Sequence, residues 1–317
     1  MTRRLDEPIL MVDVCNELEA PPAIASPARR SLVERLLLSG HPSCLFPLDL
    51  TPSPPLRARV EYGCGEFGTP LGDGPMAKVA VIVPAAGAGK RYGGKQNKIF
   101  ERIGGDQPVF LRTLEAFTSR DDVCQTMLVV SEEDMPGLKS RFGPNLGFMG
   151  VTIVQGGTTR TDSIRAALAQ LDPAAELVCV HDAVRPCVAQ PWIDDVFAEA
   201  GKTGAAILAY PVHGTLKKVS SAGVIDETVS RDDLWEAQTP QVFRVDVLLA
   251  AYASGKSATD DAGLVEAIGH PVSVVMGDPR NIKITTKADL DFAAAVIKTL
   301  PKPKDTGYHH PFDEARW

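Results

Sequence analysis

Short apolar runs alternate with amphipathic stretches along most of the chain, from about Lys78 onward. The apolar runs predict β-strands at residues 78–84, 124–131, 151–154, 177–181, 204–210 and 271–276. The amphipathic stretches predict helices at 108–118, 132–141, 160–171, 190–202, 243–254, 260–268 and 286–299. Strands that are apolar on both faces and separated by helices are typical of a doubly wound, mostly parallel α/β sheet. Ligands bind beyond the carboxyl ends of such strands, so the residues that follow each strand are the first candidates for function.

One region departs from this alternation. Residues 215–220 and 224–229 alternate in type on either side of Ser221-Ala222-Gly223, which predicts a β-hairpin. Charges lie on both predicted strands, so we expect an arm at about 212–231 that projects from the sheet and packs on a second subunit.

The first 75 residues differ from the rest in composition. They hold 11 of the chain's 25 prolines and little periodicity, which predicts either a disordered extension or a mis-assigned translation start, with Met76 as the natural one. We therefore expect one α/β domain at 76–300 and a polar C-terminal tail at 301–317.

The bulk composition excludes two classes of protein. A net charge of -7 argues against a general nucleic-acid binder, and no apolar run reaches the length of a membrane span. The six cysteines include no C-x-x-C pair, so we interpret them as reduced thiols of a cytoplasmic protein.

The first predicted strand runs into the most informative segment, Pro84-Ala85-Ala86-Gly87-Ala88-Gly89-Lys90-Arg91, and Lys95 and Lys98 follow it. Small residues let backbone N–H groups approach an anion, and the cations favour a phosphate. Tyr92 replaces the third glycine of a dinucleotide fingerprint, and the loop lacks the glycine and hydroxyl residue of a Walker motif. Several cations suit a triphosphate attacked at its α-phosphorus. The alternative is a glycine-rich turn with solvated basic residues.

Further candidates follow the later strands. Gly156, Arg160 and Ser163 suit contacts to a base or ribose, whereas Thr161 or Asp162 caps the next helix. Asp182 suits a nucleotide-bound Mg²⁺.

Five further residues lie near these candidates or follow the last predicted strand. Arg185 either pairs with Asp182 or neutralises a substrate phosphate, and His181 fits a packed strand-end residue better than a base. Near the C-terminus, Asp278 and Lys283 follow a strand, and Thr285 either contacts substrate or only starts a helix.

Taken in order, these motifs resemble one family. They include Gly156-Gly157-x-x-Arg160-x-Asp162-Ser163, His181-Asp182-x-x-Arg185-Pro186, Thr228-Val229-Ser230-Arg231, Gln238-Thr239-Pro240-Gln241 and Asn281-Ile282-Lys283-Ile284-Thr285. The combination, over about residues 78–300, is similar to 2-C-methyl-D-erythritol 4-phosphate cytidylyltransferase of the non-mevalonate isoprenoid pathway. The chain departs from the family's Pro-Lys-Gln around the second catalytic lysine, since it reads Asn97-Lys98-Ile99.

The resemblance implies a nucleotidyltransferase fold and a reaction in which the phosphate of methylerythritol phosphate attacks the α-phosphorus of CTP. It implies catalytic roles for Arg91, Lys98 and Lys283, a metal site at Asp182 with Asp278 as a second ligand, and a homodimer whose arms are exchanged. The implied nucleotide contacts are Ala85, Ala86, Gly87, Gly89, Gly156, Arg160 and Ser163. The implied substrate contacts are Arg185, Thr215, Arg231, Thr239 and Thr285.

Other functions stay open at this stage. A cytidylyltransferase acting on ribitol 5-phosphate, or a sugar-phosphate nucleotidyltransferase using another base, shares the same loop chemistry. A non-catalytic nucleotide-binding regulator would not need Arg91, Lys98, Asp182, Arg185 and Lys283 together. A dehydrogenase is disfavoured by the missing third glycine.

Overall fold

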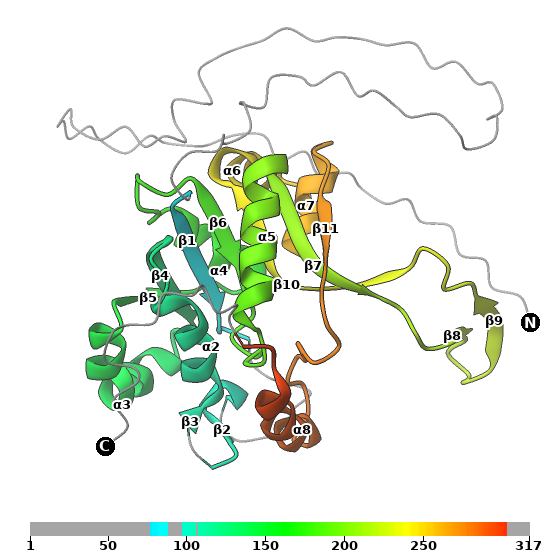
Figure 1. Cartoon of the computed structure of the whole chain (residues 1–317), viewed down its shortest axis with the longest axis horizontal. Helices are drawn as coiled ribbons and strands as arrows, with labels where there is room; N and C mark the ends of the chain where they lie inside the picture. The colour runs from blue at the N-terminus through cyan, green and yellow to red at the C-terminus, as the bar shows by residue number, and fades with distance from the viewer. Residues whose placement is uncertain (1–76, 88–96, 106, 303–317) are drawn as a thin grey trace, which may run out of the picture. The chain divides into compact units, whose positions relative to one another are not determined.

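The computed structural model describes residues 77–87, 97–105 and 107–302. At its centre is a seven-stranded sheet of order β11-β7-β10-β6-β1-β4-β5 (Figure 1). Its strands are β1 (Val79–Pro84), β4 (Val123–Val130), β5 (Val151–Gln155), β6 (Leu177–Val180), β7 (Ala205–Pro211), β10 (Trp235–Arg244) and β11 (Ser273–Met276). β1 pairs in parallel with β4 and β6, β4 with β5, and β7 with β11. The six predicted strands and the mostly parallel sheet are confirmed.

Strand β10 was not predicted, although it lies between β7 and β6 and is antiparallel to both. Its first three residues are exposed, whereas residues 238–243, its buried half, lie inside the protein. The buried half contains Gln238, Thr239 and Gln241, and the pairing with β7 is irregular between Ala237 and Gln241. A strand that changes environment halfway and buries polar residues has neither the alternation nor the apolar run by which strands are predicted.

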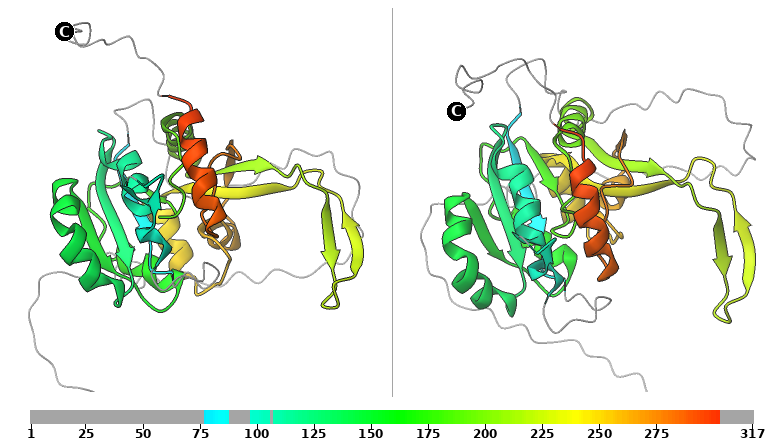
Figure 2. Two further views of the ribbon diagram at one scale, coloured as in Figure 1. Left: turned by 90° about the horizontal axis from the view of Figure 1, so that it is seen from below. Right: turned by 60° about the horizontal axis from the view of Figure 1, so that its bottom comes forward.

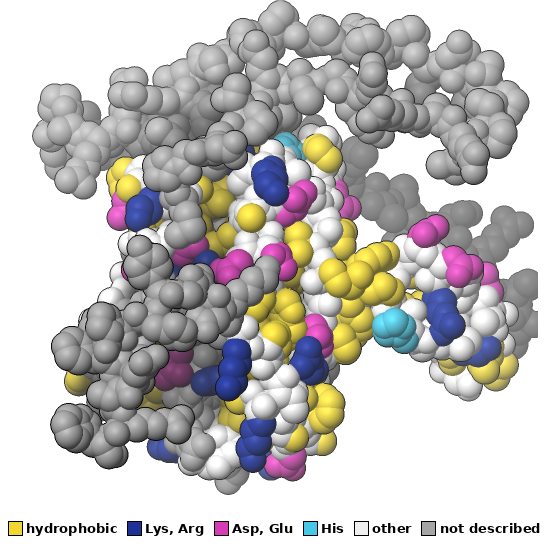
Figure 3. Space-filling model, viewed as in Figure 1, with side chains coloured by type: hydrophobic (Ala, Val, Ile, Leu, Met, Phe, Trp, Pro, Cys, Tyr) yellow, Lys and Arg dark blue, Asp and Glu magenta, His cyan; other side chains and the backbone are white. Residues whose placement is uncertain are grey.

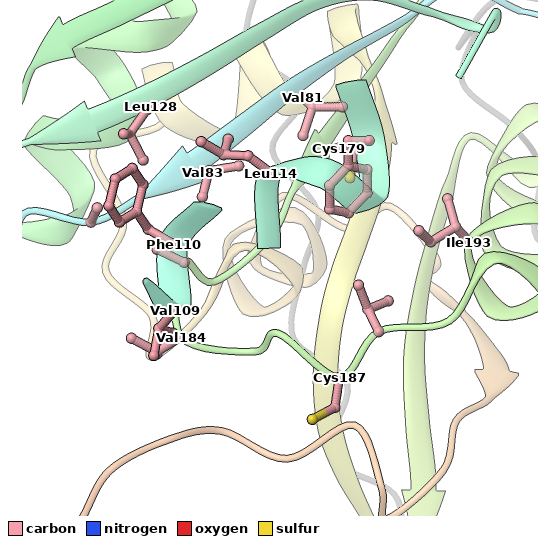
Figure 4. Close-up of a cluster of buried hydrophobic side chains, with 14 of the residues drawn as sticks. Val81, Val83, Val109, Phe110, Leu114, Leu128, Cys179, Val184, Cys187 and Ile193 are labelled. Atoms are coloured by element: carbon pink, nitrogen blue, oxygen red, sulfur yellow. The ribbon is translucent and has the colours of Figure 1, made fainter. Parts of the chain in front are cut away.

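Helices cover both faces of the sheet. One face packs against α2 (Val109–Thr118), α3 (Asp134–Phe148), α5 (Gln190–Thr203) and α8 (Ala288–Val296), and the other against α4 (Arg160–Leu168), α6 (Val245–Ala253) and α7 (Asp261–Ala267). β1 serves both cores, because Val81 and Val83 point to the first and Ile82 to the second. Figure 4 shows Val81 and Val83 in the first core with Phe110 and Leu114 of α2. Burial on both faces fixes β1, and with it the position of residues 85–87 at its end.

Four short elements complete this body: η1 (Lys98–Phe100), β2 (Arg102–Ile103), β3 (Gln107–Pro108) and η2 (Ile297–Thr299). Ile99 and Phe100 of η1 are buried, and the Phe100 ring contacts Phe110 and Phe142. Lys98 is therefore carried on a short turn that is anchored in the core.

Two antiparallel strands lie where the hairpin is predicted. β8 (Leu216–Val219) and β9 (Ile225–Val229) form a separate two-stranded antiparallel sheet, and Gly223 in the connecting turn has φ 78°. The two strands lie away from the main sheet in all three ribbon views (Figures 1 and 2). Almost every residue of the arm is exposed.

Within the described ranges, no helix has the length and apolar character needed to cross a membrane. The expectations for residues 1–75 and for most of the tail at 301–317 lie outside the described residues.

Candidate active site

A cleft of about 430 Å³ opens at the carboxyl ends of β1, β5 and β6, where a doubly wound sheet concentrates its ligands. It brings together eight of the residues predicted to form the site, from five separate segments of the chain. They are Ala85, Ala86, Gly87, Lys98, Arg160, Ser163, Asp182 and Lys283. Two further predicted residues, Gly89 and Arg91, lie outside the described residues.

The backbone that follows β1 forms one wall of the cleft. The Ala85 N–H donates to Val129 O at 2.7 Å, so the chain stays attached to the sheet one residue beyond β1. At Gly87 a side chain would meet nothing within 4 Å, so open space lies before the backbone there. Across the cleft, Lys98 Nζ donates to Ile284 O at 2.9 Å, next to Lys283. The two lysines therefore line the same cleft from distant parts of the sequence.

Asp182 lies just beyond β6 and is 9% exposed. Its Oδ2 is 2.7 Å from Lys283 Nζ and 3.6 Å from Arg185 Nε. Burial by itself would raise the pKa of this carboxyl, but Lys283, Arg185 and Arg160 outweigh it and lower the pKa to about 2. Asp182 is therefore ionised at neutral pH and carries a negative charge among cations.

A buried hydrogen-bond network holds Asp182 from behind. The Asp182 N–H donates to Thr239 Oγ1 at 3.1 Å, and Thr239 Oγ1 lies 3.2 Å from His181 Nδ1. The other ring nitrogen of His181 is 3.1 Å from Arg185 O, and burial lowers the His181 pKa to about 4. His181 is thus a packed, neutral histidine. Arg185 Nη1 donates to Asn281 O at 2.7 Å. Arg185 and Thr239 therefore lie behind Asp182, and neither is among the residues that line the cleft.

The turn after β5 forms the opposite wall. A Cβ at Gly156 would lie 2.7 Å from Ser163 Oγ, so only glycine fits there without movement. Ser163 Oγ donates to Thr159 O at 2.9 Å and accepts from Gly157 N–H at 3.2 Å. Thr159 and Asp162 form a capping box at the start of α4, so Asp162 has the predicted capping role.

Arg160 is held over the cleft by a partner that the sequence analysis missed. Its guanidinium donates to both carboxylate oxygens of Asp261, at 3.0 and 2.5 Å, and Tyr252 Oη also donates to that carboxylate at 2.5 Å. Burial alone would lower the Arg160 pKa, but the charge and hydrogen bonds of fully buried Asp261 raise it. The sequence predicts only a helix at 260–268 here; Asp260 caps α7, whereas Asp261 is buried.

Several predicted site residues do not line this cleft. Asp278 is bound by Arg280 through both carboxylate oxygens, at 2.9 and 2.7 Å, so the structure does not bring it to Asp182 as a second metal ligand. The Thr285 backbone N–H and hydroxyl both donate to Asp289 before α8, which is the helix-start alternative. Thr215 and Arg231 lie at the arm, where Arg231 Nη1 donates to His213 O. The side chains of Asp278, Thr285 and Arg231 are therefore hydrogen-bonded to groups outside the cleft lining.

The charges around the cleft suit a polyphosphate. Lys98, Arg160 and Lys283 line the cleft, and Asp182 is the one acidic residue among the described residues that line it. The adjacent backbone carries no side chain larger than a methyl group at Ala85, Ala86 and Gly87. Across the described part of the chain, no group of three or more His, Cys, Asp or Glu side chains could hold a metal without other ligands. A doubly wound sheet with such a site defines a nucleotide-dependent transferase.

Comparison with known proteins narrows this class. The sequence model of one family, described as IspD, 2-C-methyl-D-erythritol 4-phosphate cytidylyltransferase, matches residues 79–299. The chain belongs to this family, and it is therefore a nucleotidyltransferase.

Individual relatives agree over almost their whole length. The protein of that name from Rhodopirellula baltica is 44% identical over 234 residues, which are 70% of this chain and 95% of the relative. The Bacillus mycoides protein of that name is 42% identical over 227 residues, 70% of this chain and 99% of the relative. The solved structure of the Thermus thermophilus 2-C-methyl-D-erythritol 4-phosphate cytidylyltransferase has a TM-score of 0.58 and 32% identity, over 70% of this chain and 99% of that one.

Proposed function

We propose that the cleft binds CTP and that the enzyme transfers its cytidylyl group to 2-C-methyl-D-erythritol 4-phosphate. An oxygen of the polyol phosphate forms a bond to the α-phosphorus of CTP, and the bond from that phosphorus to the bridging oxygen of the β-phosphate breaks. Pyrophosphate leaves, and the product is 4-diphosphocytidyl-2-C-methyl-D-erythritol. The attacking phosphate is already ionised, so the reaction needs no general base, in keeping with a neutral, buried His181.

The observation that carries this proposal is that Lys98 and Lys283 line the same cleft and that Lys98 Nζ bonds the backbone next to Lys283. Charge on the phosphate oxygens grows and spreads as the α-phosphorus is attacked, and fixed cations stabilise it most in that state. The small residues at 85–87 let backbone N–H groups approach the phosphates, while the turn at Gly156, Arg160 and Ser163 takes the nucleoside. Arg91 and Gly89 are proposed to extend the same phosphate site.

The donor set fits one divalent cation brought in by the nucleotide. Mg²⁺ takes one or two carboxylates plus phosphate oxygens, and Asp182 is an ionised carboxylate at the cleft. When bound, the ion would neutralise part of the phosphate charge. Lys283 now pairs with Asp182 at 2.7 Å, so we propose that it turns from the carboxylate to the phosphates when the metal–nucleotide complex enters.

A pyrophosphate-release assay tests the activity. We expect release with CTP and 2-C-methyl-D-erythritol 4-phosphate, and much slower release with ATP, GTP or UTP or with ribitol 5-phosphate. Faster release with ribitol 5-phosphate would favour the alternative polyol substrate. Lys98→Ala and Lys283→Ala should each lower kcat by about 100-fold or more, because each removes a cation from the transition state. Lys139→Ala on the exposed side of α3 is the matched control.

We further propose that the enzyme is a homodimer in which the arm completes the partner's substrate site. The arm exposes Val219, Val224 and Ile225, and an apolar patch lies at its base. This base patch consists of half-exposed Leu234, Trp235, Val274 and Met276. Hydrophobic side chains gather where the arm leaves the body (Figure 3). A two-stranded ribbon is marginally stable alone, and burial against a second copy would stabilise it.

Complementation between inactive chains tests the exchanged arm. An Arg231→Ala chain is mixed with a Lys98→Ala chain under conditions in which native mass spectrometry verifies subunit exchange. Random pairing gives about half mixed dimers with one intact site each, so about a quarter of wild-type sites should return. No recovery despite verified exchange would place Arg231 in its own chain's site or outside any site.

A further inference from the structure

Asn97, the residue before Lys98, joins three parts of the protein through one side chain. Its Nδ2 donates to Ala85 O at 3.3 Å and to Asp134 Oδ2 at 2.9 Å, and its Oδ1 accepts from the Ile99 N–H at 3.3 Å. Ala85 and Asn97 both line the cleft, whereas Asp134 begins α3. The amide therefore ties the wall after β1 to the turn that carries Lys98.

Asp134 gives this contact a fixed anchor. Ser131 Oγ donates to Asp134 Oδ2 at 2.8 Å, and the Asp134 N–H donates back to Ser131 Oγ at 3.1 Å. Ser131 follows directly after β4, which is paired on both sides, with β1 and with β5. The acceptor that holds Asn97 is thus part of the rigid sheet–helix junction, and a bond to a charged acceptor is stronger than one between neutral groups.

Lys98 itself is held at both ends. Beneath it, Ile99 and Phe100 are buried, and at its far end Nζ donates to Ile284 O at 2.9 Å. Packing fixes the depth of the η1 turn, but apolar contacts are not directional. The hydrogen bonds of Asn97 set the orientation of this turn, because they are directional. The amide satisfies Ala85 O, the Asp134 carboxylate and the Ile99 N–H together in one orientation only.

We propose that Asn97 is a positioning residue, which fixes the distance between Lys98 and the backbone at Ala85 and so presents the lysine to the phosphates. This inference rests on the proposed role of Lys98 in the transferase reaction. A misplaced cation loses its effect on the transition state with little change in ground-state binding. The loss should therefore fall on kcat.

A double-mutant cycle tests the inference. Asn97→Leu keeps the approximate size and removes all three hydrogen bonds, and Asn145→Leu on the exposed side of α3 is the control. We expect Asn97→Leu to lower kcat by about 10- to 100-fold and to change KM for CTP by less than about threefold. In the Lys98→Ala background, the same substitution should change kcat by less than about twofold, because the cation it positions is absent.

Equal fold-losses of kcat in both backgrounds would overturn the proposal, since they indicate a general structural role. Wild-type kcat in Asn97→Leu, or in Lys98→Ala, would also overturn it. Thermal melting of all four proteins controls for folding. If Asn97→Leu lowers Tm equally in both backgrounds but lowers kcat only where Lys98 is present, the result supports positioning. Failure of the proposed function is distinct, because the wild-type enzyme would then release no pyrophosphate from CTP.

Discussion

The fully buried Asp261 makes a quantitative prediction, because its carboxylate meets Arg160 through two bonds and Tyr252 through a third. Breaking a buried ion pair by removing one partner costs about 3–5 kcal/mol. Arg160 keeps 37% of its side-chain area exposed, so water partly hydrates the unpaired cation. Asparagine also retains one acceptor oxygen. We therefore expect Asp261→Asn to lower the free energy of unfolding by about 2 kcal/mol.

The same substitution should weaken nucleotide binding. Arg160 would lose the bidentate contact that holds it at the cleft. We therefore expect KM for CTP to rise about tenfold, which corresponds to about 1.4 kcal/mol. Urea unfolding and steady-state kinetics measure the two effects, with Asp195→Asn on the exposed side of α5 as the control.

A double-mutant cycle of Asp261→Asn with Arg160→Met separates the interaction of Asp261 with Arg160 from the general cost of replacing a carboxylate by an amide. The coupling free energy between the two substitutions should be about 2 kcal/mol in unfolding. A coupling below about 0.5 kcal/mol, together with an unchanged KM for CTP, would refute the reasoning that Asp261 holds Arg160 in place.

Three further predictions concern the cleft and the chain termini. The folded pKa of Asp182 is about 2, below its ordinary 3.8, so its contribution is present above pH 3.8 and is lost as pH falls through 2. The unfolding free-energy difference between wild type and Asp182→Asn should thus shrink by about 2 kcal/mol from pH 7 to pH 2; a pH-independent difference would contradict this. Gly156→Val should raise KM for CTP at least about tenfold, because a Cβ there collides with Ser163 Oγ; Gly147→Val on the exposed side of α3, where a Cβ meets nothing within 4 Å, is the control. Deleting residues 1–75 should leave Tm and kcat unchanged; an insoluble product would show that they pack on the domain.

The sequence alone determined the features that depend on neighbours along the chain. Apolar runs with intervening amphipathic stretches gave the strands and helices, since the period of the pattern reflects which faces become buried. The small-residue loop after the first strand and the residues beyond the later strands predicted a phosphate site, because parallel strands end at a common edge. The hairpin followed in the same way from alternation on either side of a short polar turn.

The tertiary structure decided which polar groups are paired with one another and which remain available to a ligand. β10 inserts beside β6 although its buried half is polar, because Gln238, Thr239 and Gln241 find partners in distant segments. Asp278 is taken by Arg280, whereas Asp261 turns inward to hold Arg160. Asp278 lies two residues from its partner Arg280, whereas Asp261 lies 101 residues from its partner Arg160. In the sequence the two carboxylates look equally available. Their energies are set by burial and by the distance to a charge, and both arise only when the chain is folded.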